Sequence, residues 1–211
     1  MLPARSASWR VINGVAAVAL TLGLAACGDD AEHDMSSMSS DTETAADGDV
    51  FNRADVEFAS DMIPHHAQAI QMVTLTDTRT LDPAVKQLAE DIRAAQSPEV
   101  ETMVDWLTAW GKDIPATSMD HSHGDHEMSE MPAADMPGMM SPEDMQALAD
   151  ASDADFQDKW LQMMKEHHEG AIEMAKAEQK DGVFPDAVAL AESIQTAQEA
   201  EIEQIDQLLG G

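Results

Sequence analysis

Apolar residues recur with the period of an α-helix in four stretches of this chain. The first stretch follows residue 51. Its apolar side, taken at about 100° per residue, consists of Phe58, Met62, His65, Ala69, Met72 and Val73. Pro64 lies inside this pattern, where it removes a backbone donor, so it predicts a kink or a late helix start.

A second helix is predicted to open at Pro83, after a turn at TLDP, because proline is common at the first helical position. The stripe along this helix is formed by Leu88, Ile92, Ala95, Glu99, Met103 and Trp106. Ser97 and Pro98 are expected to interrupt the helix, with the serine able to cap a restart.

The pattern occurs twice. Residues 62–72 read MIPHHAQAIQM and residues 164–174 read MKEHHEGAIEM, at an offset of 102 residues. The same offset carries residues 58–107 onto residues 160–209 without a gap, so the duplication covers two helices in each half. One helical hairpin cannot bury its apolar stripe alone, but two can do so together. The sequence therefore predicts an all-α protein, a four-helix bundle built from two duplicated hairpins that superpose on each other.

The remaining stretches lack this period and set the domain organisation. Five segments are expected: a lipoprotein-type signal peptide (1–26), a flexible acidic tether (27–50), the first hairpin (51–111), a His/Met-rich disordered crossover (112–145) and the second hairpin (146–211).

The leader indicates export. Arg5 and Arg10 precede an apolar run that ends in LAAC, and Cys27 of this tetrapeptide is the only cysteine. This ending resembles a bacterial lipoprotein box, so we expect lipidation of Cys27 and a location at the periplasmic or outer face of a bacterial membrane. An ordinary secretory signal with an incidental cysteine, or an uncleaved anchor, remains the alternative. A single cysteine leaves no internal disulfide to stabilise an exported protein.

The charge excludes one class of partner. The chain has 41 acidic and 11 basic residues, a formal net charge of -30. Phosphate binding needs clustered Lys and Arg, so nucleic acid is not an expected partner. An acidic surface concentrates cations, which is compatible with metal binding, although solubility or life in salt accounts for it equally well.

The histidine pairs are the candidate chemistry. Imidazole suits several transition metals and thioether sulfur favours Cu(I), so the mixture predicts copper, with Cu(I) favoured and Cu(II) possible. The candidate ligands are Met62, His65, His66 and Met72, with their counterparts Met164, His167, His168 and Met174. The alternative is packing alone: methionines that fill the core and histidines that are hydrogen-bonded inside it. Burying two adjacent imidazoles without partners is costly, which favours ligation by at least one histidine of each pair.

Two glutamates lie on the apolar stripes. Glu99 and Glu201 each follow a glutamine by three residues, at equivalent positions of the two copies. A carboxylate there can orient a ligating histidine by accepting its hydrogen bond, bind metal directly, or reach water at the edge of the bundle.

The crossover offers a second group of soft ligands. Met119, His121, His123, His126 and Met128 lie among acidic residues, and flexible chains of this kind bind soft ions exchangeably. A solvated linker of drifted composition is the alternative.

The segments MIPHHAQAI, LAEDIRAAQSPEV and WLTAWG, with MKEHHEGAIEM and LAESIQTAQEAEI, resemble the exported, ferritin-like family known as domain of unknown function 305. The resemblance implies a four-helix bundle and, for its CopM-type members, periplasmic copper binding through Met and His. Di-iron bundles use Glu-x-x-His pairs, whereas Met62 and Met164 stand three residues before a histidine here, which argues against oxygen-activating iron.

These patterns predict a lipid-anchored, extracytoplasmic, copper-binding protein that sequesters or transfers copper and is not an enzyme. Its expected partners are metal ions, a lipid membrane and an unidentified copper-transfer protein. A metal-dependent oxidoreductase on the same bundle and a metal-free structural lipoprotein are the alternatives.

Overall fold

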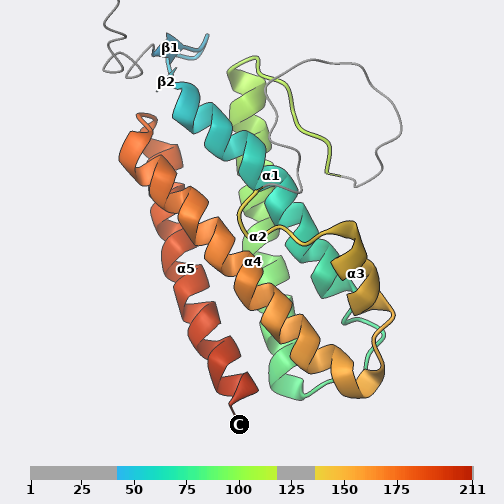
Figure 1. The fold of residues 1–211 in the computed structure, drawn as a ribbon. Coiled ribbons are helices and arrows are strands. Elements are labelled where there is room, and N and C mark those ends of the chain that lie inside the picture. Colours follow the sequence, from blue (N-terminus) through green and yellow to red (C-terminus); the bar gives the residue numbers. More distant parts are fainter. Residues whose placement is uncertain (1–41, 118–135, 211) are drawn as a thin grey trace, which may run out of the picture. The chain divides into compact units, whose positions relative to one another are not determined.

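Two antiparallel helical hairpins form a four-helix bundle (Figure 1). The computed structural model describes residues 42–117 and 136–210, which belong to one compact unit, Ser39–Gly211. The first hairpin is α1 (Arg53–Thr74) with α2 (Pro83–Ala109), and the second is α4 (Asp153–Asp181) with α5 (Pro185–Leu209). The predicted fold class is confirmed.

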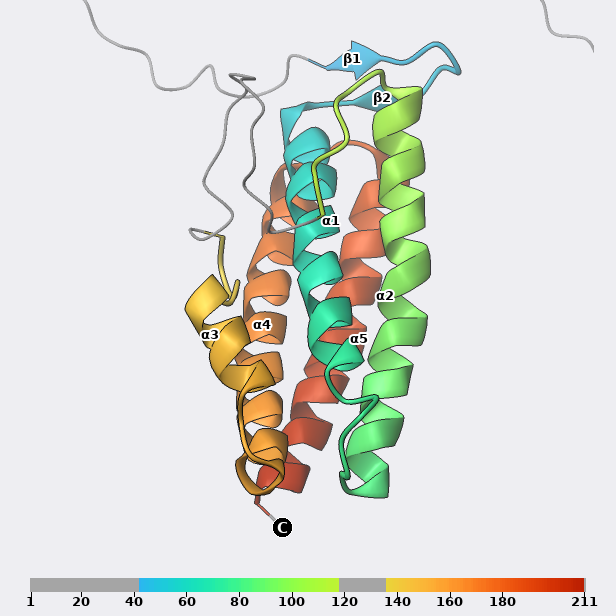
Figure 2. The ribbon, with the colours of Figure 1, turned by 90° about the vertical axis from the view of Figure 1, so that its right-hand side faces the viewer.

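The two hairpins meet through α1 and α4. Figure 2 shows α1 descending from the end that carries the short strands, α2 and α4 rising, and α5 descending to the C-terminus. The contacts between hairpins are made mainly by α1 with α4. Equivalent helices of the two repeats therefore run antiparallel, so equivalent residues can meet only near the middle of the bundle.

Local signals set where the helices begin. Asn52 caps α1 by accepting from the backbone N–H of Asp55, whose carboxylate accepts from Asn52 N in return, a capping box. Asp82 and Ser152 cap α2 and α4 through their side-chain oxygens. Pro83 and Pro185 open α2 and α5, at the position predicted for Pro83.

The expected interruptions at proline are absent from α1 and α2. Both helices run continuously through Pro64 and Pro98. Ser97 does not cap a restart, because its hydroxyl donates to the carbonyl oxygen of Arg93 at 2.8 Å, one turn back. Packing on both sides of each proline keeps the helix intact, and local propensity is overridden.

The end of the predicted tether has structure. β1 (Glu43–Thr44) and β2 (Val50–Phe51) form an antiparallel pair. Lys112, just after α2, binds β1 through a salt bridge from its Nζ to Oε1 of Glu43 at 2.8 Å. The boundary expected at residue 51 therefore falls inside β2. Phe51 is buried and stacks on Trp110 with ring centroids 4.5 Å apart, which holds the pair against the bundle.

The end of the predicted crossover is also ordered, contrary to the expectation of disorder up to residue 145. Residues 136–141 lead into a short helix, α3 (Pro142–Ala149), capped by Ser141. Met140 and Leu148 are buried in the core, and two isolated apolar contacts of this kind leave no period in a sequence. The leader with Cys27 and the crossover candidates from Met119 to Met128 lie outside the described residues. None of the helices in the described ranges is long and apolar enough to span a membrane.

The apolar core has two parts. We name them after their tryptophans. The Trp160 cluster includes Met72, Leu88, Ile92, Met140, Leu148, Phe156, Trp160, Met163 and Met164. The Trp110 cluster includes Phe51, Phe58, Met62, Met103, Leu107, Trp110 and Phe184, with Met174 packed against it. Trp160 spans the hairpins, because its indole N–H donates to the carbonyl oxygen of Met72 at 2.9 Å.

A buried pair of carboxyl groups closes the bundle at the α4–α5 turn. Asp55 is fully buried and accepts backbone N–H groups from Asn52, Val183 and Phe184 at 2.6, 3.0 and 2.9 Å. Glu178 is only 1% exposed. Burial is the largest cause that raises the pKa of Glu178, and the neighbouring carboxylates of Asp55 and Asp181 act in the same direction, so that together they raise it to about 9. Glu178 is therefore protonated at neutral pH.

This pair predicts an unusual pH dependence of stability. The ordinary pKa of Glu178 is 4.5, so between pH 4.5 and about 9 the folded protein keeps a proton that the unfolded chain has lost. The contribution of this group to the free energy of unfolding must fall as pH rises through that window, by at most about 1.4 kcal/mol per pH unit. Glu178→Gln should remove this slope, measured by chemical denaturation from pH 5 to 9. Glu173→Gln, at an exposed position of the same helix, is the control. Equal slopes in wild type and Glu178→Gln would contradict the assignment.

Candidate metal centre

Four histidines form a buried layer in the middle of the bundle. His65 and His66 lie on α1, His167 and His168 on α4, and each is 0–1% exposed. Adjacent residues on a helix point about 100° apart. One histidine of each pair therefore faces the other repeat, and its neighbour faces the partner helix of its own hairpin.

The inner histidines meet where α1 crosses α4. The rings of His65 and His167 have centroids 3.8 Å apart and planes tilted by 39°. His65 donates from Nε2 to the carbonyl oxygen of Pro137 at 3.1 Å. These two residues are equivalent in the repeat, and the antiparallel pairing of α1 with α4 brings them together.

The outer histidines are held by the glutamates of the apolar stripes. The Nε2 atom of His66 lies 2.8 Å from Glu99 Oε2, and that of His168 lies 2.7 Å from Glu201 Oε2. The donor must be the imidazole N–H, because a carboxylate only accepts. Each glutamate therefore fixes the proton on Nε2 and leaves a lone pair on Nδ1, the arrangement by which a carboxylate orients a ligating histidine.

None of the remaining ring nitrogens has a partner among the described residues. The Nδ1 atoms of all four histidines and Nε2 of His167 are buried without a hydrogen bond to any described residue. The same holds for both amide atoms of Gln96 and for Oε1 of Gln198, one turn before Glu99 and Glu201. Each unpaired buried polar atom costs about 1–3 kcal/mol. The imidazole nitrogens in this set that carry no proton offer lone pairs, and lone pairs gathered in one layer fit a bound cation.

Burial keeps the inner rings neutral. Desolvation, followed by repulsion from the neighbouring His66 and His168, lowers the pKa of His65 to about 3, although the hydrogen bond to Pro137 opposes this shift. Desolvation and the neighbouring histidines also lower the pKa of His167 well below 6.5. Neutral imidazole is the form that binds metals, so no proton need be displaced from these rings at neutral pH.

The histidine nitrogens alone do not form a complete metal-coordination site. Within residues 42–117 and 136–210, no three His, Cys, Asp or Glu side chains converge in a way that could hold a metal ion. A bound ion would need thioether sulfur, or a shift of the rings, to complete its coordination.

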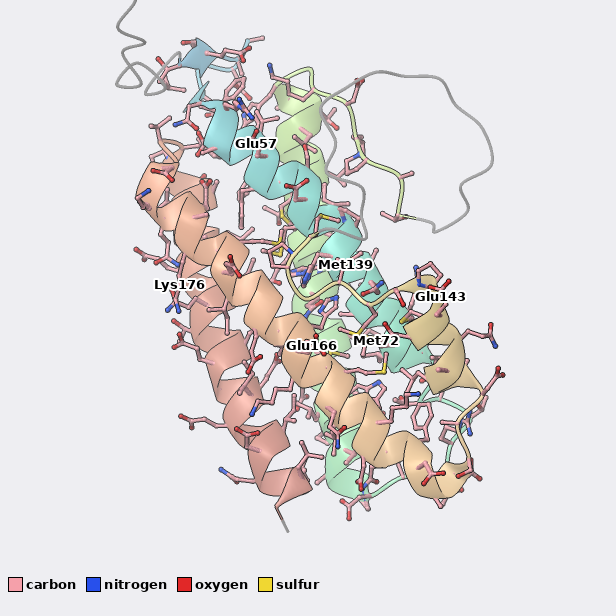
Figure 3. All side chains as sticks on the ribbon, viewed as in Figure 1. Glu57, Met72, Met139, Glu143, Glu166 and Lys176 are labelled. Atoms are coloured by element: carbon pink, nitrogen blue, oxygen red, sulfur yellow. The ribbon has the colours of Figure 1, made fainter. Side chains whose placement is uncertain are left out.

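Methionines lie on both sides of the histidine layer. Met62 and Met164 are fully buried one turn before His65 and His167. Met72 and Met174 lie seven residues after these histidines, roughly 10 Å along the helix axis, which is too far to share one ion with them directly. The antiparallel pairing places Met62 and Met174 on the Trp110 cluster, and Met72 and Met164 in the Trp160 cluster. Figure 3 shows Met72 and other sulfur atoms in this central part of the bundle.

Four residues at this site were not predicted as site residues. Gln96 and Gln198 recur at the repeat offset three residues before the glutamates, and this recurrence was the signal available in the sequence. Gln68 and Pro137 gave no such signal, because the counterpart of Gln68 in the second copy is Gly170, and Pro137 lies outside the repeat. Their role depends on residues 136–140 lying against α1.

The fold and this layer define a class: four-helix bundles with a duplicated His-His hairpin. Residues 55–209 match the family described as domain of unknown function (DUF305), and the chain belongs to this family. Among curated proteins, the uncharacterized protein L153 of Acanthamoeba polyphaga mimivirus is 45% identical over 49 residues, 23% of this chain. The match spans about a third (32%) of that relative's length.

Solved structures of the same family share the fold. A DUF305 fragment from Deinococcus radiodurans is 26% identical, with a TM-score of 0.65 over 80% of this chain and 99% of the other. A DUF305 protein from Streptomyces coelicolor, provisionally described as secreted, is 32% identical, with a TM-score of 0.63 over 74% and 91%. CopM in its Cu(II)-bound form is 29% identical, with a TM-score of 0.59 over 74% and 95%. This chain is therefore similar to a protein that binds copper.

The buried layer predicts unusual histidine titration in the metal-free protein. The imidazoles of His65 and His167 should remain neutral at pH 5.5, where an ordinary histidine is mostly charged, because burial lowers both pKa values. Nitrogen-15 NMR of the imidazole rings measures this directly. Charged His65 and His167 in the folded protein at pH 5.5 would contradict the prediction.

Proposed function

We propose that this protein binds copper in the histidine layer and sequesters it or passes it on outside the cytoplasm. The observation that carries the proposal is the set of five buried, unpaired nitrogens on four imidazoles. Structures of CopM in Cu(II)-bound, Cu(I)-bound and silver-bound forms support the same class of ion.

The residues have separate parts in this proposal. Nδ1 of His65, His66, His167 and His168 would donate to copper, and Glu99 and Glu201 would hold the outer rings in the ligating tautomer. Met62 and Met164 are the thioethers one turn away and would favour Cu(I). Met72 and Met174 lie farther along the helices, in position to receive an ion that leaves the histidines. Neutral rings in an apolar core favour the singly charged Cu(I), whose burial costs less than that of a divalent ion.

The acidic surface and the leader give the proposal its location. A net charge of -30 attracts cations from solution. Lipidation at Cys27 would anchor the protein at the periplasmic or outer face of a bacterial membrane, where an unidentified protein would donate or accept copper. A metal-dependent oxidoreductase is less well supported, because methionine occupies the positions at which di-iron bundles place a carboxylate.

Methionine variants test the soft character of the site. Met62→Leu and Met164→Leu conserve shape and apolarity, so folding should change little. The double variant should bind Cu(I) at least about tenfold more weakly while Zn(II) binding changes less, because imidazole serves both metals and thioether favours Cu(I). Anaerobic competition titration measures both affinities.

Histidine variants and a methionine outside the layer complete this test. The double variant His65→Ala with His167→Ala should bind both Cu(I) and Zn(II) more weakly. Met145→Leu, at a half-buried position on α3, is the matched control and should bind like the parent. If Cu(I) affinity is unchanged in both double variants, the layer is packing and the proposal is wrong.

The crossover histidines are proposed as separate, exchangeable sites. Replacing His121, His123 and His126 with serine should lower the number of copper ions bound per chain and leave the tightest site unaffected. Metal analysis after equilibrium dialysis, alongside thermal unfolding, measures both effects. An unchanged number of bound ions would make these residues bystanders.

A further inference from the structure

Residues 136–140, here called the strap, cross the junction of α1 and α4 at the histidine layer. Figure 3 shows Met139 where this segment passes in front of the helices. The strap is irregular backbone just before α3, and Met136 and Met140 are 7% and 6% exposed. The carbonyl oxygen of Pro137, a strap residue, accepts the hydrogen bond from Nε2 of His65.

Gln68 fastens the strap to α1. Its amide nitrogen donates to the carbonyl oxygen of Met140 at 2.9 Å, and its amide oxygen accepts from Met140 N at 2.7 Å. Gln68 is 1% exposed, so both hydrogen bonds are shielded from water. These two bonds and the bond from His65 are the side-chain hydrogen bonds that residues 136–140 make with the described helices.

Two glycines let the strap approach α4. A Cβ on Gly170 would lie 2.1 Å from the carbonyl oxygen of Pro137, and a Cβ on Gly138 would lie 2.8 Å from that of Glu166. Gly138 also has φ +74°, a conformation that disfavours other residues. The strap can therefore pack against α4 only because residues 138 and 170 are both glycines.

The strap breaks the symmetry of the repeat. Gln68 and Gly170 occupy equivalent positions, 102 residues apart, three residues after His65 and His167. In the first copy the Gln68 side chain binds the strap, and in the second copy the absence of a side chain at Gly170 leaves space for the strap. As a result, His65 has Nε2 occupied, whereas neither ring nitrogen of His167 has a partner among the described residues.

We propose that the strap is a gate, which covers the histidine layer when seated on Gln68 and Gly170 and must lift before an ion can reach or leave the layer. The alternative routes along the bundle axis pass through the Trp110 and Trp160 clusters, and opening either would expose large buried side chains. Lifting the strap breaks three hydrogen bonds and uncovers Met136 and Met140, but leaves the large aromatic side chains of both clusters in place. It also frees Nε2 of His65.

Gly170→Ala tests the gate, because its Cβ cannot coexist with the seated strap. Two rates should rise about tenfold or more: modification of His65 and His167 by diethylpyrocarbonate in the metal-free protein, followed by mass spectrometry of the peptides, and loading of Cu(I) in stopped flow. Release of Cu(I) should accelerate similarly, so the equilibrium affinity should change much less than either rate. Gln68→Leu, which conserves bulk and removes two hydrogen bonds, should act in the same direction by roughly severalfold to tenfold.

Gly182→Ala is the matched control. It makes the same substitution with a similarly close contact, 2.2 Å to Glu178 Oε1, at the α4–α5 turn instead of the strap. It should leave both rates near those of the parent. Should Gly170→Ala fail to fold, Gln68→Leu provides the test.

The inference is overturned if the folded strap variant shows unchanged histidine modification, or if Gly182→Ala accelerates it equally. The copper rates rest on the proposed function, whereas reagent access to the metal-free protein does not. Failure of the parent to bind copper would refute the proposed function and leave the modification test of the gate valid.

Discussion

The contact between His65 and His167, where α1 crosses α4, is the constraint on which the rest of the structure depends. It buries polar rings in the middle of an apolar core and divides that core into the Trp110 and Trp160 clusters. Burial in turn requires partners: Glu99 and Glu201 for the outer histidines and the Pro137 carbonyl for His65. The nitrogens still without partners give this layer the most unpaired buried polar atoms in the described core. They lower the free energy of unfolding, and a bound ligand would restore it.

Duplication supplies two equivalent halves, and the antiparallel pairing decides what they build. Each His-His pair uses one ring within its own hairpin and the other between hairpins, which explains why the histidines are adjacent. The halves are then made unequal at one position. Gln68 holds the strap and Gly170 admits it, so only one face of the layer is covered by residues 136–140. Symmetric ligands with an asymmetric cover would allow one side to serve for exchange while the other keeps its coordination.

Carboxyl groups serve two different purposes in this bundle. Glu99 and Glu201 are partly exposed and accept from imidazole, so their negative charge is balanced by a donor. Glu178 is buried beside Asp55, whose charge is already satisfied by three backbone N–H groups, so Glu178 retains its proton. Nothing in the sequence around Glu178 separates it from the many surface glutamates of so acidic a chain. Its state follows from the approach of the α4–α5 turn to the start of α1.

The repeat offset, the apolar period and the proline that opens a helix were readable from the chain, because they are local or recur at a fixed spacing. They predicted four helices, two hairpins and the candidate histidines. Continuity through Pro64 and Pro98 was not readable, because packing against neighbouring helices outweighs a local break. The pairing of His65 with His167, the grouping of Met62 with Met174, and the seating of residues 136–140 required the tertiary structure. Each joins segments far apart in the chain, and helical periodicity specifies which face of a helix is apolar but not which helix will cover it.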